Sequence, residues 1–152
     1  TTKSVVFPGA TGEMKGYWAR PKSASGPLGS IIVIHENRGL NPHIKDITRR
    51  VAVEGYLAFG IDALSPDGGT PNDEDQARDM IGKLTGDNAE ARASAAVRFL
   101  AQHSLSTGKV GAIGFCWGGG QAFRGKAVSG EFSDQAVRGA LRGRPAMIGR
   151  GH

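Results

Sequence analysis

The feature that most constrains the fold is the short segment of residues 30–34, in which Ser30 is followed by an unbroken run of the β-branched residues Ile and Val. β-Branched residues favour strands, and a strand without polar alternation is typical of one buried on both faces of a parallel sheet. Residues 56–61 and 110–115 have the same character, and segments with helical periodicity lie between these runs. Strand and helix in alternation predict an α/β fold whose doubly wound, mostly parallel sheet carries helices on both faces.

Local signals place the elements around the first of these strands. Residues 4–7 and 14–20 alternate between apolar and polar side chains, and the turn-forming residues 8–12 between them indicate a hairpin. Asn41 followed by proline is an N-cap signal, and apolar residues then recur at helical spacing until Gly55. We therefore expect a hairpin before the central strand and a helix after it.

Two more helices are expected further along the chain. One covers residues 74–84, and the other begins at Asp87, which is supported as the N-cap by Glu90 three residues later. The loop at residues 62–75 contains several Pro and Gly residues and follows a strand. Because open α/β sheets bind ligands at the carboxyl ends of their strands, this loop is predicted to contact a substrate.

Composition and charge limit the class of protein. A chain of 152 residues with 39% hydrophobic content predicts one compact domain over residues 1–152. Residues 1–120 hold 13 Lys and Arg against 12 Asp and Glu, whereas residues 121–152 hold six against two, so the positive charge belongs to the tail. There is no basic helical stripe, and no apolar run approaches the roughly 20 residues that cross a bilayer. We expect a soluble protein, monomeric or weakly dimeric, that binds neither nucleic acid nor membrane.

The compartment is predicted from the same features. Absence of a charged and then apolar leader favours the cytoplasm. The chain starts at Thr1 rather than Met, so an exported protein with a processed N-terminus is the alternative.

The single cysteine stands in a pattern that indicates a nucleophile. Residues 114–118 read Gly-Phe-Cys-Trp-Gly after an apolar strand, which is the glycine-x-nucleophile-x-glycine arrangement of a sharp turn between strand and helix. Glycines at both flanks avoid collisions with the neighbouring strand and helix. A helix N-terminus lowers the pKa of a thiol placed there, which favours the reactive thiolate. The alternative is that Cys116 is an inert, buried thiol.

A second candidate segment follows the strand at residues 30–34. It reads His-Glu-Asn-Arg-Gly-Leu-Asn-Pro over residues 35–42, and it is expected beside the cysteine turn in a doubly wound sheet. Glu36 could contact the thiol and hold or accept its proton, although a solvated loop carboxylate is the simpler interpretation. His35 is more often a hydrogen-bonded structural histidine than a base.

Three motifs together resemble the dienelactone hydrolase (carboxymethylenebutenolidase) family of the α/β-hydrolase superfamily. Their order and separations carry the resemblance, which covers residues 5 to about 123. The motifs are residues 33–42, the acidic loop at residues 62–66 and the segment of residues 108–120.

The resemblance implies specific roles for residues of this chain. It implies a Cys-His-Asp triad in which Cys116 is the nucleophile, with Glu36 as the carboxylate that contacts it at rest. The backbone N–H groups of Trp117 and Asn37 are expected to form the oxyanion hole. It also implies an arginine that binds an acidic substrate. Arg78 is the nearer candidate by position, and Arg38 is the poorer one.

The predicted activity is hydrolysis of a lactone or small ester through an acyl-thioenzyme, without a cofactor or metal. The chain shows no His-x-x-x-His or paired-cysteine spacing, so no metal site is expected. A broader carboxylesterase or thioesterase on the same site is one alternative. A non-catalytic fragment or binding domain is the other.

The tail departs from the family pattern. Residues 124–152 are rich in Gly and Arg, and only residues 136–141 resemble the next family strand, so the domain is expected to lack its C-terminal part. Asp134 and His152 follow Cys116 in the order nucleophile, acid, base. Only 18 residues separate each from the one before it, too few for the intervening strand-helix-strand units of about 30 residues. We expect the triad acid and base to lie outside this chain.

Overall fold

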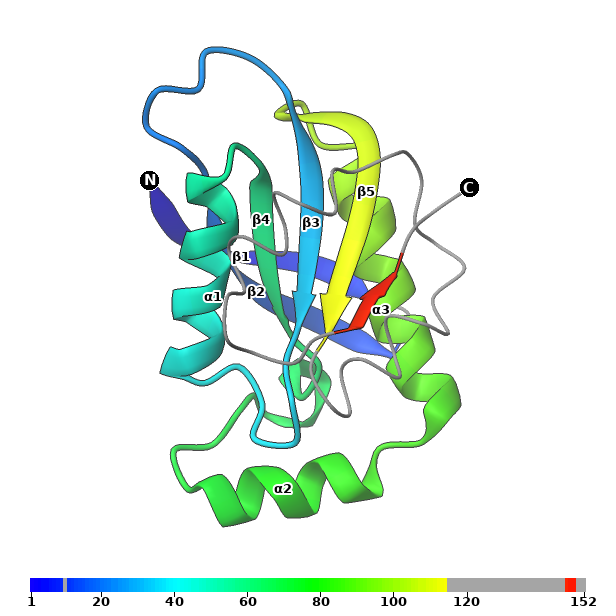
Figure 1. Ribbon diagram of the computed structural model, residues 1–152. Coiled ribbons are helices and arrows are strands. Elements are labelled where there is room, and N and C mark those ends of the chain that lie inside the picture. The colour runs from blue at the N-terminus through cyan, green and yellow to red at the C-terminus, as the bar shows by residue number, and fades with distance from the viewer. Residues whose placement is uncertain (10, 115–146, 150–152) are drawn as a thin grey trace.

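The computed structural model describes residues 1–9, 11–114 and 147–149 (Figure 1). In this part of the chain, six strands form one sheet in the order β1-β2-β4-β3-β5-β6. The strands are β1 (Thr2–Gly9), β2 (Gly12–Ala19), β3 (Leu28–Ile34), β4 (Leu57–Asp62), β5 (Ser106–Gly114) and β6 (Met147–Gly149). The hairpin predicted at the start of the chain is present, because β1 pairs antiparallel with β2.

The predicted parallel strands form the centre of the sheet. β3 lies between β4 and β5 and is parallel to both, with Ile34 paired to Ile61 on one side and to Gly114 on the other. The remaining pairs, β1 with β2, β2 with β4 and β5 with β6, are antiparallel, so the sheet is mixed. The carboxyl ends of β3, β4 and β5 therefore meet at one edge, as the sequence predicted.

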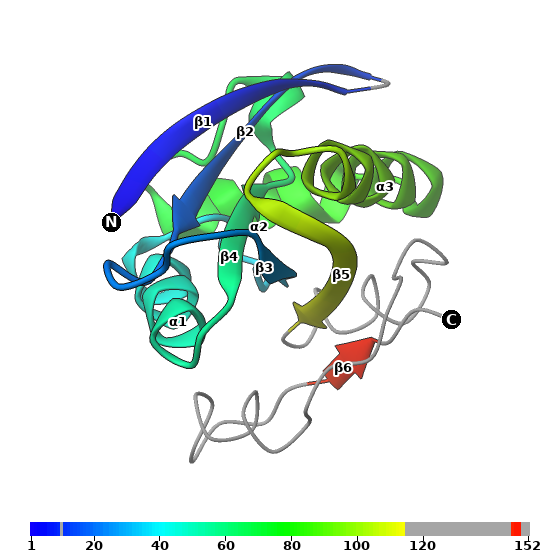
Figure 2. The ribbon, with the colours of Figure 1, turned by 90° about the horizontal axis from the view of Figure 1, so that it is seen from above.

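Helices cover both faces of the sheet, which confirms the doubly wound α/β architecture. α1 (Pro42–Val53) lies on one side and α3 (Gly86–Ala101) on the other (Figure 2). Alternate residues of β3 pack into two apolar clusters, one on each face of the sheet. Ile31 and Val33 pack in the cluster with α1, whereas Ile32 and Ile34 pack in the cluster with α3. A strand buried on both faces needs apolar residues at successive positions, which explains the uninterrupted run.

The helix ends follow local hydrogen bonding. The Asn41 side chain accepts a hydrogen bond from the Ile44 amide and caps α1 as predicted, and Gly55 beyond its end has a φ of 104°. The predicted cap of α3 was wrong. Thr85, not Asp87, is the N-cap, since its Oγ1 accepts from the Asn88 amide at 3.2 Å. Both residue types cap helices well, so the pattern allowed either start.

The segment between β4 and α3 lies across the carboxyl edge of the sheet. After β4, the short 3₁₀ helix η1 (Ser65–Asp67) precedes α2 (Glu74–Lys83), which crosses below the ends of β3 and β5 (Figure 1). A small apolar cluster of Leu64, Ala77 and Ile81 holds α2 in place. The predicted loop at residues 62–75 thus contains a helical turn and leads into α2 at the functional edge.

Candidate active site

The two segments with predicted chemistry meet at the carboxyl edge of the sheet. Ile34 ends β3 and pairs with Gly114, which ends β5. The loop that begins at His35 therefore starts beside the chain that continues towards Cys116. Cys116 itself and Trp117 lie outside the described residues, as do Asp134, His152 and residues 136–141.

His35 is a structural residue, as the sequence favoured. It is fully buried, its Nε2 accepts a hydrogen bond from the Ala63 amide at 3.0 Å, and its Nδ1 contacts the Glu36 carbonyl oxygen at 2.7 Å. Burial lowers the pKa of His35 below its ordinary value, partly offset by the hydrogen bond to Glu36 and by the nearby Asp62 carboxylate. A neutral ring fits these contacts, since Nε2 accepts and Nδ1 donates.

Glu36 and Asn37 lie on the turn that follows His35. The Glu36 side chain is one-third exposed, and its Oε1 is 4.0 Å from Nε2 of His43 on α1. Asn37 is exposed at the next position of the turn. The turn closes when the Gly39 amide donates to the Glu36 carbonyl oxygen at 3.3 Å. Contact of Glu36 with a thiol, and of the Asn37 N–H with a ligand, remain predictions.

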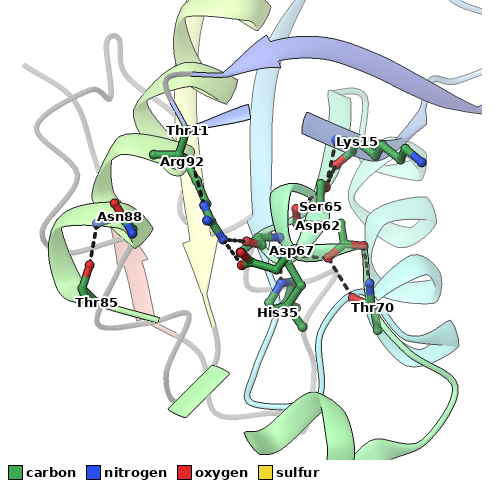
Figure 3. A network of polar contacts seen from close by, with 12 residues as sticks. Thr11, Lys15, His35, Asp62, Ser65, Asp67, Thr70, Thr85, Asn88 and Arg92 are labelled. Carbon is green, nitrogen blue, oxygen red and sulfur yellow. Dashed lines mark hydrogen bonds and ion pairs between the residues drawn. The ribbon is translucent and has the colours of Figure 1, made fainter. Parts of the chain in front are cut away.

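A buried carboxylate joins this turn to the loop after β4. Asp62 accepts hydrogen bonds from the Leu64 amide and from both the amide and the hydroxyl of Thr70, at 2.8–3.0 Å (Figure 3). The Thr70 hydroxyl in turn accepts from the Leu40 amide at 2.9 Å. Gly39 faces the same threonine, and a Cβ at Gly39 would lie 2.6 Å from Thr70 Cγ2. Sequence reasoning missed this network, which links residues up to 30 positions apart.

The two candidate substrate arginines are exposed and paired with acids of α2. Arg38 Nη1 lies 3.2 Å from Glu74 Oε2, and Arg78 pairs with Asp75 one helical turn earlier. Each guanidinium is about half exposed, so either could exchange its partner for a ligand carboxylate. Arg38 reaches towards α2 from the loop after β3, and α2 itself carries Arg78. Their role in substrate binding stays a prediction.

Arg92 is a buried cation that sequence reasoning did not single out. It is 3% exposed and joins three segments, with hydrogen bonds to Thr11 Oγ1 at 3.0 Å and to the Ala63 carbonyl and Asp67 Oδ2 at 2.7 Å (Figure 3). A cavity of about 330 Å³ opens beside it, between the end of α2 and the start of α3. The described residues that line it are Asp67, Met80, Lys83, Leu84, Asn88 and Arg92. No sequence signal identified Arg92, because its helix face is otherwise rich in alanine.

Two other site types are absent from the described part of the chain. Within residues 1–9, 11–114 and 147–149, no three His, Cys, Asp or Glu side chains gather where they could hold a metal ion. Among the same residues, no helix has the length and apolar character that crossing a bilayer requires.

Comparison with known sequences assigns the chain to a family. The sequence model of the dienelactone hydrolase family matches residues 14–138, which is most of the chain. The chain belongs to the dienelactone hydrolase family. This confirms the resemblance that rested on three motifs.

Two relatives show how much of a related protein this chain matches. It is 47% identical over 73 residues to the "Putative hydrolase fragment YghX" of Escherichia coli K12, which covers 48% of this chain and 62% of that protein. It is 34% identical over 117 residues to the "Putative carboxymethylenebutenolidase" of the same organism, covering 74% of this chain and 43% of that one.

A solved structure agrees with the fold. The crystal structure of the dienelactone hydrolase-like promiscuous phosphotriesterase P91, from metagenomic libraries, matches with a TM-score of 0.70 and 31% identity. The match covers 80% of this chain and 52% of that one. The chain thus spans about half the length of the dienelactone hydrolase relatives that it matches.

Proposed function

We propose that the protein is a hydrolase that cleaves a lactone or a small ester, with the Cys116 thiolate as nucleophile. One observation carries most of the argument, namely the parallel pairing of Ile34 with Gly114. It brings the Glu36–Asn37 turn beside the end of β5, and Cys116 follows Gly114 by two residues in the sequence. Membership of the dienelactone hydrolase family supports the reaction class.

The proposed reaction has two steps. The Cys116 sulfur attacks the carbonyl carbon, the bond from that carbon to the ring or ester oxygen breaks, and the leaving oxygen takes up a proton. Water then adds to the thioester carbon, the carbon–sulfur bond breaks, and the thiolate is regenerated. Each step passes through a tetrahedral oxyanion, for which the N–H groups of Asn37 and Trp117 are the proposed donors.

Glu36 is proposed to hold or accept the proton of the resting thiol. Its side chain is partly exposed on the turn. Its Oε1 lies as far as 4.0 Å from His43 Nε2, so the carboxylate does not form a close ion pair with that histidine. A protonated Cys116 could therefore use it as an acceptor. General-base assistance of this kind typically contributes about 10²- to 10⁴-fold to a rate.

The test separates an enzyme from a non-catalytic domain. Iodoacetamide should alkylate Cys116 with a rate that titrates below the ordinary thiol pKa of about 8.5. p-Nitrophenyl acetate should acylate the same residue, and Cys116→Ala should abolish acylation. Alkylation that is slow at all pH values, together with an acylation rate unchanged in Cys116→Ala, would overturn the assignment.

A broader ester specificity is the second candidate. It is favoured by the promiscuous phosphotriesterase whose structure this chain matches at 31% identity. A panel of a carboxylated enol lactone, a neutral aryl acetate, an acyl thioester and a phosphotriester, assayed against the same Cys116→Ala control, distinguishes the two. Comparable rates on all four would favour the broad hydrolase.

A further inference from the structure

The peptide between Glu36 and Asn37 is held on its carbonyl side by two donors. Nδ1 of His35 lies 2.7 Å from the Glu36 carbonyl oxygen, and the Gly39 amide donates to that oxygen at 3.3 Å. No described peptide bond is cis, so this peptide is planar and trans. In a trans peptide the N–H points opposite to the C=O. Whatever fixes the Glu36 carbonyl therefore also fixes the direction of the Asn37 N–H.

The tautomer of His35 follows from its second contact. The Ala63 backbone can only donate through its amide, so Nε2 of His35 must be the unprotonated acceptor at 3.0 Å. A neutral ring then carries its proton on Nδ1 and donates it to the Glu36 carbonyl oxygen. The ring is buried, and Figure 3 shows it near Asp62, the last residue of β4. The imidazole thus connects the backbone after β4 to the turn after β3.

We infer that His35 is a positioning residue for the oxyanion hole: its Nδ1–H fixes the Glu36 carbonyl and thereby aims the Asn37 N–H. The inference rests on the proposed function, which assigns the Asn37 N–H to the oxyanion. An oxyanion donor works only when it lies 2.7–3.1 Å from the developing charge, so a rotated peptide loses the interaction. Because His35 is fully buried, its ring has little freedom to follow such a rotation.

The turn is also held at Leu40 by hydrogen bonds that do not involve His35. The role of His35 can therefore be tested separately from a general loosening of the loop. The Leu40 amide donates to Thr70 Oγ1, and that hydroxyl donates to Asp62 at 2.8 Å. This anchor holds the backbone three residues beyond Asn37. Thr70→Val removes it without touching the Glu36 carbonyl, so it serves as a control for general loosening of the loop.

Two substitutions of His35 separate its two hydrogen bonds. Asn places an amide N–H near the position of Nδ1, so His35→Asn keeps the donor to Glu36 and loses the acceptor for Ala63. Gln places an amide oxygen near the position of Nε2, so His35→Gln keeps the acceptor and loses the donor. Both variants bury an amide in place of the imidazole and lose one hydrogen bond of the ring. In His35→Asn the Ala63 amide loses its acceptor, whereas in His35→Gln the Glu36 carbonyl keeps the Gly39 amide as a donor, so His35→Gln should be no less stable than His35→Asn.

The experiment measures acylation of Cys116 by p-nitrophenyl acetate in the full 152-residue chain. Loss of a whole oxyanion donor costs about 10²- to 10³-fold, so a misaimed donor in His35→Gln should slow acylation by at least about 10-fold. The acylation rate of His35→Asn should stay within about threefold of the parent protein. Equal rates in the two variants, or a slower rate in His35→Asn, would overturn the inference.

An NMR measurement keeps the inference testable without catalysis. The Asn37 amide signal should shift or broaden in His35→Gln and keep its parent position in His35→Asn and Thr70→Val. If the parent protein fails to acylate Cys116, the proposed function is overturned, and the Asn37 signal still decides whether His35 orients the peptide. An Asn37 signal unchanged in His35→Gln would refute the positioning role by itself.

Discussion

Replacement of Arg92 by methionine should destabilise the protein by about 2 kcal/mol. Methionine keeps most of the apolar stem but removes the hydrogen bonds to Thr11, Ala63 and Asp67. Thr11 is exposed and the Asp67 side chain is 48% exposed, so both can bind water instead. The Ala63 carbonyl is buried and loses its partner, which costs about 1–3 kcal/mol. Part of this loss is offset because a charge is no longer buried.

Thermal and urea unfolding measure the effect. For a domain of about 150 residues, each kcal/mol lowers Tm by about 2–4 °C, so Arg92→Met should melt about 4–8 °C below the parent. The matched control is Arg98→Met, an exposed arginine six positions later on α3, which should change the stability by less than about 0.5 kcal/mol. A Tm shift in Arg92→Met no larger than that of the control would refute this reasoning.

Three further predictions concern the loops at the carboxyl edge. Gly39→Ala should lower the free energy of unfolding by at least about 1–2 kcal/mol in urea titration, because φ is 75° and the added Cβ meets Thr70; the change at Gly82, a helical glycine with open space around it, should not destabilise. Burial lowers the pKa of His35 in the folded protein, so the contribution of the neutral ring to stability is fully present above the unfolded pKa of 6.5. As the pH falls from there towards the folded pKa, the free energy of unfolding should drop by up to about 1.4 kcal/mol per pH unit. His35→Asn should lack this pH dependence, and identical pH profiles for the two proteins would contradict the prediction. Arg78→Ala should raise KM for a carboxylated lactone and leave neutral esters unchanged, whereas equal effects on both would indicate a structural role.

The central elements were predictable because their signals are local. The apolar run in β3 and the Asn41 cap of α1 are encoded within a few residues, and both were confirmed. The start of β5 was missed by four residues. Ser106 and the polar residues after it show no strand signal in the sequence. They extend the strand because Ser106 pairs with Leu28 and its hydroxyl accepts a hydrogen bond from the Ser30 hydroxyl. A strand end held by such distant partners cannot be read from its own sequence.

The candidate site also contains features that the sequence predicted and features that it did not. The structural role of His35 was predicted from what buried histidines commonly do, and its contacts confirm it. The Asp62–Thr70 bonds and the Arg92 contacts were not predicted, since they depend on how loops from three strands approach one another. The bond from Arg92 to Thr11 spans 81 positions, which no local pattern specifies. Cys116 and Trp117 fall outside the described residues, so their roles stay proposals.

The central position of β3 has a consequence for the order of folding. The β1–β2 hairpin joins neighbouring segments and can form early, whereas β3 must wait for partners on both sides. His35 meets Ala63 28 positions later, and Ser30 meets Ser106 76 positions later. Closing loops of this length is slow compared with hairpin formation, and on the ribosome it must follow synthesis of β5. The edge that carries the proposed chemistry therefore forms later than the β1–β2 hairpin, and only once β5 has been synthesised and can pair with β3.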